Sequence, residues 1–385
     1  MKKYIAAENV QLVQSGDNYF NLLEEIINQS KITLHLQMYI FETDTTGLRI
    51  VNALKQAAAR NVSVFILLDA FGSYSFSREI VQELLLCGIR FRFFSPLFSF
   101  ESGYFGRRLH YKLIVADKKT SLTGGINIAD KYNINSSEAP WLDYALLIKG
   151  KVCEYLHFFC EEMYQRKRSD ALQLLERNLL PPDAQKEKVK IRFRVNDWLK
   201  RKNEIQKSYL ESISNARKSI TIISSYFLPN RILRQQLTKA SSRGVEIKIL
   251  LTKKSDVWSA KLAENYLYDF YLRNKIRLYE WNNSILHAKV MIVDDNWVTI
   301  GSYNLNFLSH YISIELNTDV SNITFANKLT KHVEQIITDD KVCNEINKNE
   351  KKNNRMVQLK MWLFYTFYFL LMNIIVSKKR QRKLN

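Results

Sequence analysis

Hydrophobic and polar positions follow two different periods along this chain. Segments rich in β-branched and aromatic residues predict strands, and segments with apolar residues three and four positions apart predict helices. In the first part of the chain, this pattern predicts strands at residues 32–41, 62–69 and 89–94, and helices at 48–60 and 77–86. Because strands and helices alternate, we expect the α/β class, with a mostly parallel sheet covered by helices on both faces.

The same order of elements recurs about 180 residues later. Residues 219–227 resemble residues 32–41, and both segments carry a tyrosine near the end of the strand, Tyr226 and Tyr39. A predicted helix at 232–243 and a predicted strand at 245–252 follow. A nearly constant offset between long segments indicates an internal duplication.

The duplication and the composition of the segments around it divide the chain into four predicted parts. Between the repeats, charged clusters and the pair Pro181–Pro182 indicate a linker. We therefore predict two similar α/β/α lobes and a separate tail, with boundaries at 1–165 for the first lobe, 166–190 for the linker, 191–340 for the second lobe and 341–385 for the tail.

The predicted tail is both basic and hydrophobic. It carries 11 Lys and Arg against two Glu, and residues 361–376 are apolar or aromatic except for Thr366 and Asn373. Lys360 precedes this run and a basic cluster starting at Lys378 follows it. As a helix, 16 residues extend about 24 Å, against the ~30 Å hydrocarbon core of a bilayer. The run could span a membrane with snorkelling lysines, lie at the membrane interface, or form a buried core helix.

The composition and net charge of the chain limit the kinds of molecule that it is expected to bind. The chain has 57 Lys and Arg against 38 Asp and Glu, a net charge of +19, and 46% hydrophobic residues. The apolar content excludes global disorder, and the surplus of positive charge favours nucleic acid, an anionic membrane or a phosphorylated substrate as partner. The four cysteines form no CxxC pair, which argues against a structural zinc site and a disulfide framework. The N-terminus has no apolar run of the length of a signal peptide.

One constellation of chemically capable residues occurs twice, within HYKLIVADKKTSLTGGIN and HAKVMIVDDNWVTIGSYN. Its two copies have identical spacing, and comprise His110, Lys112, Asp117 and Asn127 in the first and His287, Lys289, Asp294 and Asn304 in the second. Because residues i and i+2 of a strand share a face, each His points with its Lys, while the Asp falls at the following turn. A second short strand then brings the Asn back beside them.

An imidazole, an ammonium group and a carboxamide around one spot suit a phosphate group. If the two halves fold toward each other, two imidazoles would lie on opposite sides of one phosphorus. We then expect double displacement, in which one His attacks phosphorus. The other His donates a proton to the alcohol that leaves and later takes a proton from the alcohol that enters. This chemistry requires no metal or other cofactor. The sequence offers no separate metal-binding cluster, and we interpret His35, His157, His310 and His332 as structural.

These motifs resemble those of the phospholipase D superfamily, HxKx4D followed by GGxN or GSxN. The resemblance covers roughly residues 10–340 and is closest to bacterial cardiolipin synthases of the B type, through YIFETDTTG, LLDAFGS, SSYFLPN and GSYNLNFLS. It implies a two-lobed α/β fold and a phosphohistidine intermediate, with His110 as nucleophile and His287 as acid and base. It further implies that a later acid in each half orients a histidine, for which Asp143 and Glu315 are the candidates. Arg107 and Arg108 stand before the first motif, where an Arg-Asn pair is frequent.

We therefore predict a phosphatidyltransferase that makes cardiolipin from two phosphatidylglycerols, or from phosphatidylglycerol and another phospholipid. The alternatives are a phospholipase D that transfers the phosphatidyl group to water, a nuclease of the same superfamily, and a membrane scaffold without activity. We expect an anionic phospholipid membrane and a phospholipid substrate as partners, rather than nucleic acid. The expected location is the cytoplasmic side of the cell membrane, peripheral or anchored by the C-terminal segment. Because both motifs lie in one chain, a dimer is not required.

Overall fold

The structure is a computed structural model that describes residues 3–95, 107–133, 139–167, 189–347 and 355–381 of the 385-residue chain. Most of the predicted linker lies outside the described residues. The chain separates into two compact units. The first unit contains residues 1–195, 299–302 and 313–322, and the second contains 196–298, 303–312 and 323–385.

The elements before the linker match the predicted alternation of strands and helices. They are β1 (Ile5–Ala7), β2 (Asn9–Gln14), α1 (Asp17–Gln29), β3 (Thr33–Met38), α2 (Thr45–Ala59), β4 (Ser63–Asp69), α3 (Arg78–Leu86), β5 (Arg90–Phe94), β6 (Arg108–Leu109), β7 (Lys112–Ala116), β8 (Thr120–Gly124), the 3-10 turn η2 (Asp130–Tyr132), β9 (Tyr144–Lys149) and α4 (Cys153–Gln165). The first-unit sheet has the strand order β2-β9-β8-β7-β3-β4-β5. The predicted α/β class is confirmed.

The sheet of the first unit is mixed, so the expectation of a mostly parallel sheet was wrong. Strands β3, β4 and β5 are parallel, as the intervening helices require. In contrast, β7 pairs antiparallel with both β3 and β8, and β9 pairs antiparallel with β8 and β2. The reason is local, because only three residues, 117–119, join β7 to β8, and strands connected so tightly can only run antiparallel.

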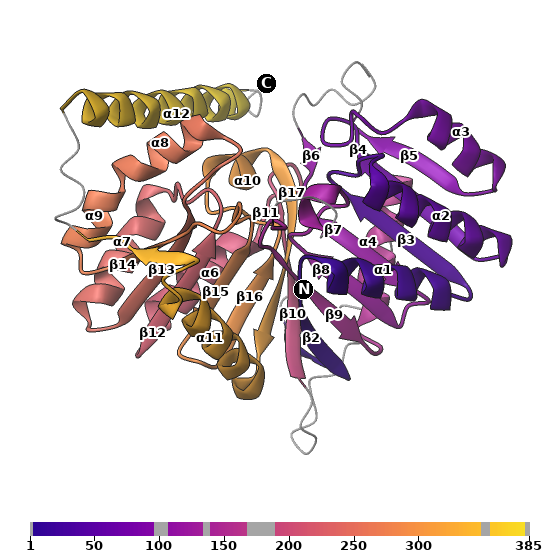
Figure 1. The fold of residues 1–385 in the computed structure, drawn as a ribbon, viewed down its shortest axis with the longest axis horizontal. Helices are drawn as coiled ribbons and strands as arrows, with labels where there is room; N and C mark the ends of the chain where they lie inside the picture. Colours follow the sequence, from indigo (N-terminus) through magenta and orange to yellow (C-terminus); the bar gives the residue numbers. More distant parts are fainter. Residues whose placement is uncertain (1–2, 96–106, 134–138, 168–188, 348–354, 382–385) are drawn as a thin grey trace. The chain divides into compact units, whose positions relative to one another are not determined.

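Alternate residues of β3 face different helices. Leu34, Leu36 and Met38 belong to the hydrophobic core that also contains buried residues of α1 and α2. His35 and Gln37 point the other way, toward α4, where Gln37 donates a hydrogen bond to the Cys160 carbonyl oxygen at 2.8 Å. Helices therefore cover both faces of this sheet, as predicted (Figure 1).

The elements after the linker repeat the arrangement of the first part. They are β10 (Val189–Asp197), β11 (Lys202–Asn203), α6 (Glu204–Asn215), β12 (Ser219–Ser224), α7 (Arg231–Ser242), β13 (Glu246–Thr252), α8 (Trp258–Tyr266), α9 (Tyr268–Arg273), β14 (Arg277–Trp281), β15 (Lys289–Val293), β16 (Trp297–Gly301), α10 (Phe307–Tyr311), β17 (Ser313–Ser321), α11 (Ile323–Thr338), β18 (Cys343–Glu345) and α12 (Arg355–Gln381). Strands β12, β13 and β14 are parallel, and β15 pairs antiparallel with β12. These pairings correspond to those of β3, β4, β5 and β7.

The compact units do not follow the two sequence repeats completely. Strand β17 comes from the second repeat, yet Ser313–Asn322 belongs to the first unit. There, β17 pairs in parallel with the short strand β6, matching Ser313 with Arg108 and Ile314 with Leu109. Strand pairing therefore brings a segment of the second repeat next to the first histidine motif.

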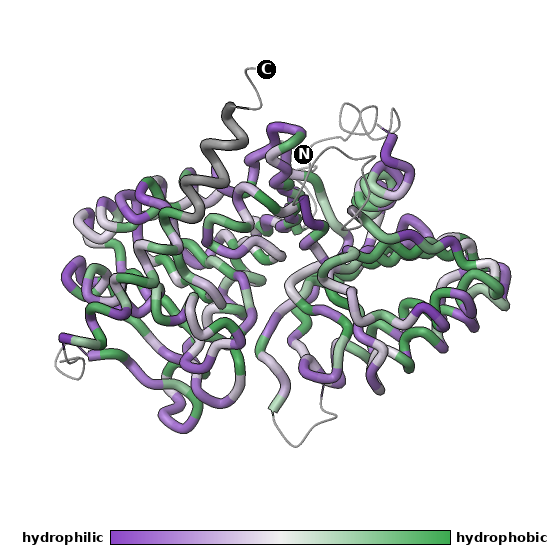
Figure 2. Tube along the Cα trace, turned by 90° about the horizontal axis from the view of Figure 1, so that it is seen from above, coloured by the Kyte–Doolittle hydropathy of each residue, from purple (hydrophilic) through white to green (hydrophobic). Residues whose placement is uncertain are grey.

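Helix α12 includes the predicted C-terminal hydrophobic segment and packs along α8 within the second unit (Figure 1). The Phe364 and Trp258 ring centroids lie 5.0 Å apart, and those of Tyr365 and Tyr266 lie 4.9 Å apart. Figure 2 shows hydrophobic and hydrophilic segments alternating along the chain in both units. Among the described residues, no helix combines the length and the hydrophobicity needed to cross a bilayer. This finding does not support the prediction that the C-terminal segment anchors the chain by spanning a membrane.

Candidate active site

The aspartate of each motif occupies the tight turn between two antiparallel strands. In the first hairpin, Asp117 and Lys118 have φ values of 51° and 59°, and in the second, Asp294 and Asp295 have 51° and 53°. Positive φ at both central residues is the requirement of a type I′ turn, whose twist matches that of the flanking strands. Aspartate tolerates this conformation better than most residues, so the motif aspartate fits the turn for a conformational reason.

Each of these carboxylates also binds the start of the neighbouring strand. Asp117 accepts hydrogen bonds from the backbone N–H groups of residues 31, 32 and 33, at 2.9, 2.8 and 2.9 Å. Asp294 accepts from the N–H groups of residues 217, 218 and 219 in the same way. The geometry gives both aspartates a structural role: they fix the hairpin that carries His and Lys against the preceding strand.

The first histidine is held between a backbone pairing and a tyrosine ring. The His110 N–H donates to the Ile314 carbonyl oxygen at 3.0 Å, which continues the pairing of β6 with β17. Its imidazole packs edge-on against Tyr39, with ring centroids 4.6 Å apart. The Lys112 ammonium lies 5.1 Å from the centre of the same tyrosine ring and donates to the His110 carbonyl oxygen at 2.6 Å. The predicted convergence of His110 and Lys112 is therefore present.

A buried carboxylate completes this site. Glu315 on β17 is fully buried, and its Oε2 lies 2.9 Å from Nδ1 of His110. The same oxygen accepts a hydrogen bond of 2.5 Å from the Ser302 hydroxyl. A carboxylate can only accept, so this contact places the proton of a neutral His110 on Nδ1 and makes Nε2 the nitrogen that carries the lone pair. Sequence reasoning included Glu315 as an orienting acid but had no signal for Ser302 as its partner.

Both motif asparagines have their side-chain oxygen occupied by the protein. Asn127 Oδ1 accepts from the Ile40 N–H at 3.2 Å, and its Nδ2 donates to the Tyr132 hydroxyl at 2.9 Å. Asn304 Oδ1 accepts from the Ser225 hydroxyl at 2.8 Å. These contacts fix the orientation of each carboxamide, so that phosphate oxygens could bind the amide nitrogen, which in Asn127 has one N–H already donated to Tyr132.

The second histidine and lysine converge in the second unit. His287 and Lys289 are both buried, and Lys289 Nζ lies 2.8 Å from Nδ1 of His287. Lys289 also donates to the His287 carbonyl oxygen, as Lys112 does in the first motif. The Tyr226 ring centroid lies 6.4 Å from that of His287, so the repeated tyrosine again accompanies the histidine.

Asp143 and Glu315 occupy corresponding places beside the two glycine-containing segments. Asp143 is fully buried, and a Cβ on Gly125 would lie 2.2 Å from its Oδ1. Ser302 stands at the position corresponding to Gly125 and donates to Glu315. A small residue at each of these positions lets the acid approach the backbone closely.

Sequence reasoning missed a buried acid beside the first motif. Asp69, at the end of β4, accepts from the Leu109 N–H at 2.8 Å and lies 3.5 Å from Nη1 of Arg108. Burial raises the pKa of Asp69. Burial of Tyr39 and the nearby charge of Asp69 raise the pKa of Tyr39 to about 12. The tyrosine is therefore neutral at physiological pH, and Arg108 adds positive charge near the site. The repeated tyrosine and the two arginines before the motif were visible in the sequence, although their partner was not.

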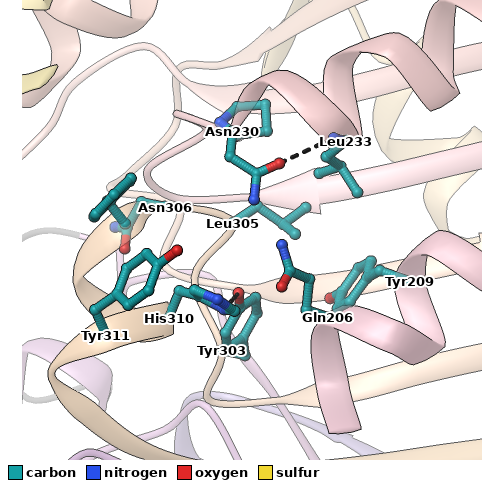
Figure 3. A pocket seen from close by; sticks show the side chains of 11 residues that line it. Gln206, Tyr209, Asn230, Leu233, Tyr303, Leu305, Asn306, His310 and Tyr311 are labelled. Carbon is teal, nitrogen blue, oxygen red and sulfur yellow. Dashed lines mark hydrogen bonds between the residues drawn. The ribbon is translucent and has the colours of Figure 1, made fainter. Parts of the chain in front are cut away.

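A small pocket in the second unit is lined by residues next to Asn304 of the second motif (Figure 3). Tyr303 and Leu305 line it on both sides of Asn304 in sequence, and the Tyr303 hydroxyl lies 3.2 Å from Nδ1 of His310. Its volume of about 20 Å³ holds about one water molecule. The pocket is therefore too small for a phospholipid headgroup. His310, which lines it, is neutral at physiological pH, because burial lowers its pKa to about 4.

A family model described as cardiolipin synthase, PLD-like domain, matches residues 23–151 and 209–340. These stretches cover more than half of the chain, and each contains one copy of the histidine motif. The chain belongs to this cardiolipin synthase family of the phospholipase D superfamily. The resemblance inferred from the motifs is confirmed.

Similar proteins agree with this assignment. Cardiolipin synthase B of Salmonella typhimurium is 30% identical over 348 residues, covering 88% of this chain and 82% of the relative. Cardiolipin synthase B of Escherichia coli is 29% identical with the same coverage. Among solved structures, phosphatidylserine synthase of Haemophilus influenzae superposes with a TM-score of 0.75 at 14% identity, covering 97% of this chain and 96% of that one. This last similarity confirms the fold.

Proposed function

We propose that this protein is a phosphatidyltransferase that makes cardiolipin and glycerol from two phosphatidylglycerol molecules. The observation that carries the proposal is the His110–Glu315 pair, because it favours the tautomer in which Nε2 of a partly exposed imidazole carries the lone pair that would attack phosphorus. The duplicated motif supplies a second histidine for proton transfer, and the similar proteins named cardiolipin synthase B support the choice of substrate.

In the proposed first step, Nε2 of His110 attacks the phosphorus of phosphatidylglycerol. The bond between phosphorus and the glycerol oxygen breaks, and His287 donates a proton to that oxygen, so that glycerol leaves. In the second step, His287 takes the proton from the glycerol hydroxyl of another phosphatidylglycerol. That oxygen attacks phosphorus, the bond from phosphorus to His110 breaks, and cardiolipin is formed.

The cationic and amide groups of the motifs suit the charge that develops on the phosphate oxygens. Lys112 and Lys289 are both buried, and a buried ammonium group interacts with a phosphate more strongly than an exposed one. Asn127 and Asn304 would donate N–H groups to the same oxygens. We propose that Asp143 serves as an orienting acid for a motif histidine in the way that Glu315 does.

The test is product analysis after incubation of the purified full chain with phosphatidylglycerol vesicles. Mass spectrometry should detect cardiolipin, with one glycerol released for each cardiolipin formed. The His110→Ala variant should form none. Rapid quenching of wild-type protein with alkaline detergent, which preserves the acid-labile phosphorus–nitrogen bond, should trap labelled protein when the phosphatidylglycerol is labelled at phosphorus, and this label should be absent in His110→Ala. Release of phosphatidic acid without cardiolipin would instead identify a hydrolase and overturn the transferase proposal.

We also propose that α12 docks on the surface of an anionic membrane. Met356, Leu359, Leu363, Phe367 and Leu370 follow one another at helical intervals of three and four residues, so they share one face of the helix. They are 50% to 64% exposed. Met361, Phe364 and Tyr365 belong to the opposite face, and the last two pack against α8.

The charge of the sequence around α12 agrees with such a surface. Arg355 and Lys360 lie on the helix, and five of the six residues 378–383 are Lys or Arg. A helix with an apolar face and flanking positive charge binds anionic lipid by hydrophobic burial and electrostatic attraction together. The second packed face distinguishes α12 from a free amphipathic tail, because α8 holds it in place.

Vesicle flotation tests this docking. Wild-type protein should float with phosphatidylglycerol-rich vesicles and bind neutral phosphatidylcholine vesicles less. The double variant Leu363→Ser and Phe367→Ser should lose most binding. Ile32→Ser, which removes a 68% exposed apolar residue from the other unit, is the matched control and should bind as wild type. Equal flotation of the double variant and wild type would contradict the assignment of this face.

A further inference from the structure

Three potential metal ligands meet on the α4 side of the first unit, away from the motif residues. His35 lies on β3, and His157 and Glu161 lie on α4. One ligand atom from each lies within 4.8 Å of the other two. The sequence interpretation of both histidines as purely structural did not foresee this cluster, because 122 residues separate His35 from His157 in the chain.

The geometry of the cluster is set by its two elements. His157 and Glu161 are four residues apart on a helix, so they share one face, and Nε2 of His157 lies 3.3 Å from Oε1 of Glu161. The His35 ring approaches from the sheet, with its centroid 4.8 Å from that of His157. Phe65, the residue paired with His35 on the neighbouring strand β4, stacks on the His35 ring at 4.7 Å between centroids and restricts its orientation.

The two imidazoles are buried and incompletely hydrogen-bonded. His35 is 1% exposed and His157 is 2% exposed. Within the described part of the chain, neither ring nitrogen of His35 has a hydrogen-bond partner, and neither does Nδ1 of His157. A buried polar atom without a partner costs free energy, so native structures rarely leave one without some ligand. By contrast, the neighbouring buried Gln37 on β3 has both of its side-chain polar atoms paired, because it donates to the Cys160 carbonyl oxygen and accepts from the Tyr111 hydroxyl.

We propose that His35, His157 and Glu161 bind a divalent transition-metal ion, with Zn²⁺ as the best match. Two imidazoles and one carboxylate are a donor set that zinc prefers, with metal–nitrogen distances of about 2.0–2.1 Å. Such an ion would bind one nitrogen of each imidazole, so it would give one of the two unpartnered His35 nitrogens a ligand, and it would tie α4 to β3. Its role would be structural, and the proposed transfer chemistry does not involve it.

The protonation state of the imidazoles agrees with this assignment. Burial lowers the pKa of His35 to about 3 and that of His157 to about 4. Both rings are therefore neutral at physiological pH, which is the form that binds metals. The Lys118 charge opposes a cation here, because it also lowers both pKa values. Lys118 Nζ lies 4.9 Å from the centre of the Phe158 ring. Replacing Lys118 by Gln should therefore tighten metal binding.

The experiment uses tag-free full-length protein that has been stripped with a chelator and then titrated with Zn²⁺ against a chromophoric competitor. Wild type should bind one ion per chain through this site. Glu161→Gln should bind at least tenfold more weakly, and so should His157→Gln. Glu162→Gln, which changes the adjacent glutamate on the same helix, is the matched control and should bind as wild type. His110→Ala should also retain the ion, which separates this site from the catalytic histidines.

A second measurement keeps the proposal testable if a variant folds poorly. Zn²⁺ should raise the melting temperature of wild type and Glu162→Gln but not that of Glu161→Gln, whose circular dichroism spectrum should match that of wild type without metal. With Co²⁺ as probe, the visible absorption of a low-symmetry nitrogen and oxygen site should appear in wild type and be absent in His157→Gln. Equal zinc affinity of Glu161→Gln and Glu162→Gln, or no binding to wild type at micromolar zinc, would overturn the proposal.

Discussion

Glu315 follows His110 by 205 residues in the chain, yet its Oε2 lies 2.9 Å from Nδ1 of that imidazole. The contact exists because β17 pairs with β6, so that the second sequence repeat supplies the acid for the histidine of the first repeat. The duplicated motif is therefore not two self-sufficient copies. One repeat contributes the imidazole and the other contributes the carboxylate that orients it.

Glu315→Gln should reduce kcat by roughly a hundredfold or more, since the loss of an orienting carboxylate elsewhere costs up to about 10⁴-fold in kcat. The amide can hydrogen-bond the imidazole but does not enforce the proton on Nδ1. KM should change little, because Glu315 is buried and oriented toward His110. Steady-state cardiolipin synthesis over a range of phosphatidylglycerol concentrations measures both parameters.

Ser302→Ala provides the graded comparison for Glu315→Gln. It removes the hydroxyl that donates to Glu315 but leaves the acid itself in place, so kcat should fall by a smaller factor. Glu315→Asp should restore part of the activity lost in Glu315→Gln. If Ser302→Ala were as damaging as Glu315→Gln, or if KM carried the whole effect, an orienting role for Glu315 would be contradicted.

Asp117→Ala should lower the free energy of unfolding by about 1–3 kcal/mol, because three backbone N–H groups lose a charged acceptor. At a temperature where the variant is folded, kcat/KM should stay within a few-fold of wild type. Urea denaturation followed by circular dichroism measures the first quantity. Asp340→Ala, an exposed aspartate in the second unit, is the control and should be neutral. A large loss of activity with unchanged stability would mean that the motif aspartate takes part in the chemistry.

Gly125→Ala should reduce activity strongly while leaving the sheet folded. The added Cβ would lie 2.2 Å from Oδ1 of Asp143, so the carboxylate must move. Gly88→Ala is the matched control: its Cβ meets nothing within 4 Å, but φ is +78°, so it should cost stability of about 1 kcal/mol and no activity. Parallel assays of cardiolipin synthesis and melting temperature distinguish the two effects. Wild-type activity in Gly125→Ala would contradict the proposed role of Asp143.

Acid should destabilise the protein through His35 and His157. Their pKa values in the folded state are lowered to about 3 and about 4, against about 6.5 when unfolded. Between these values the unfolded chain binds more protons, so the stability contributed by the neutral rings falls as pH drops from about 6.5 toward 4. With chelator present, His35→Leu should show a smaller difference in unfolding free energy between pH 7 and pH 5 than wild type. Phe65→Leu, which alters the same packing without a titratable group, should keep the wild-type difference.

Much of the fold was legible in the sequence because it depends on local patterns. The period of apolar residues predicted β3, β4, α2 and their counterparts in the second repeat, with boundaries that shifted by a few residues. The hairpins were also predictable from the motif itself, since the aspartate marks the turn and His-x-Lys marks one face of a strand. The mixed pairing of the sheet was not, because periodicity says which residues are buried but not which strands are neighbours.

The sequence alone determined which chemically active residues are present and which of them share a face. It contains two copies of the histidine motif at fixed spacing, and in a strand alternate side chains point to opposite faces. Only the tertiary structure decided the partners of these residues. Pairing of β6 with β17 selected Glu315 for His110, and packing of α4 on β3 brought His157 and Glu161 to His35. The physical reason is that side-chain spacing along one element is fixed by backbone geometry, whereas contacts across more than a hundred residues depend on which elements pair and pack.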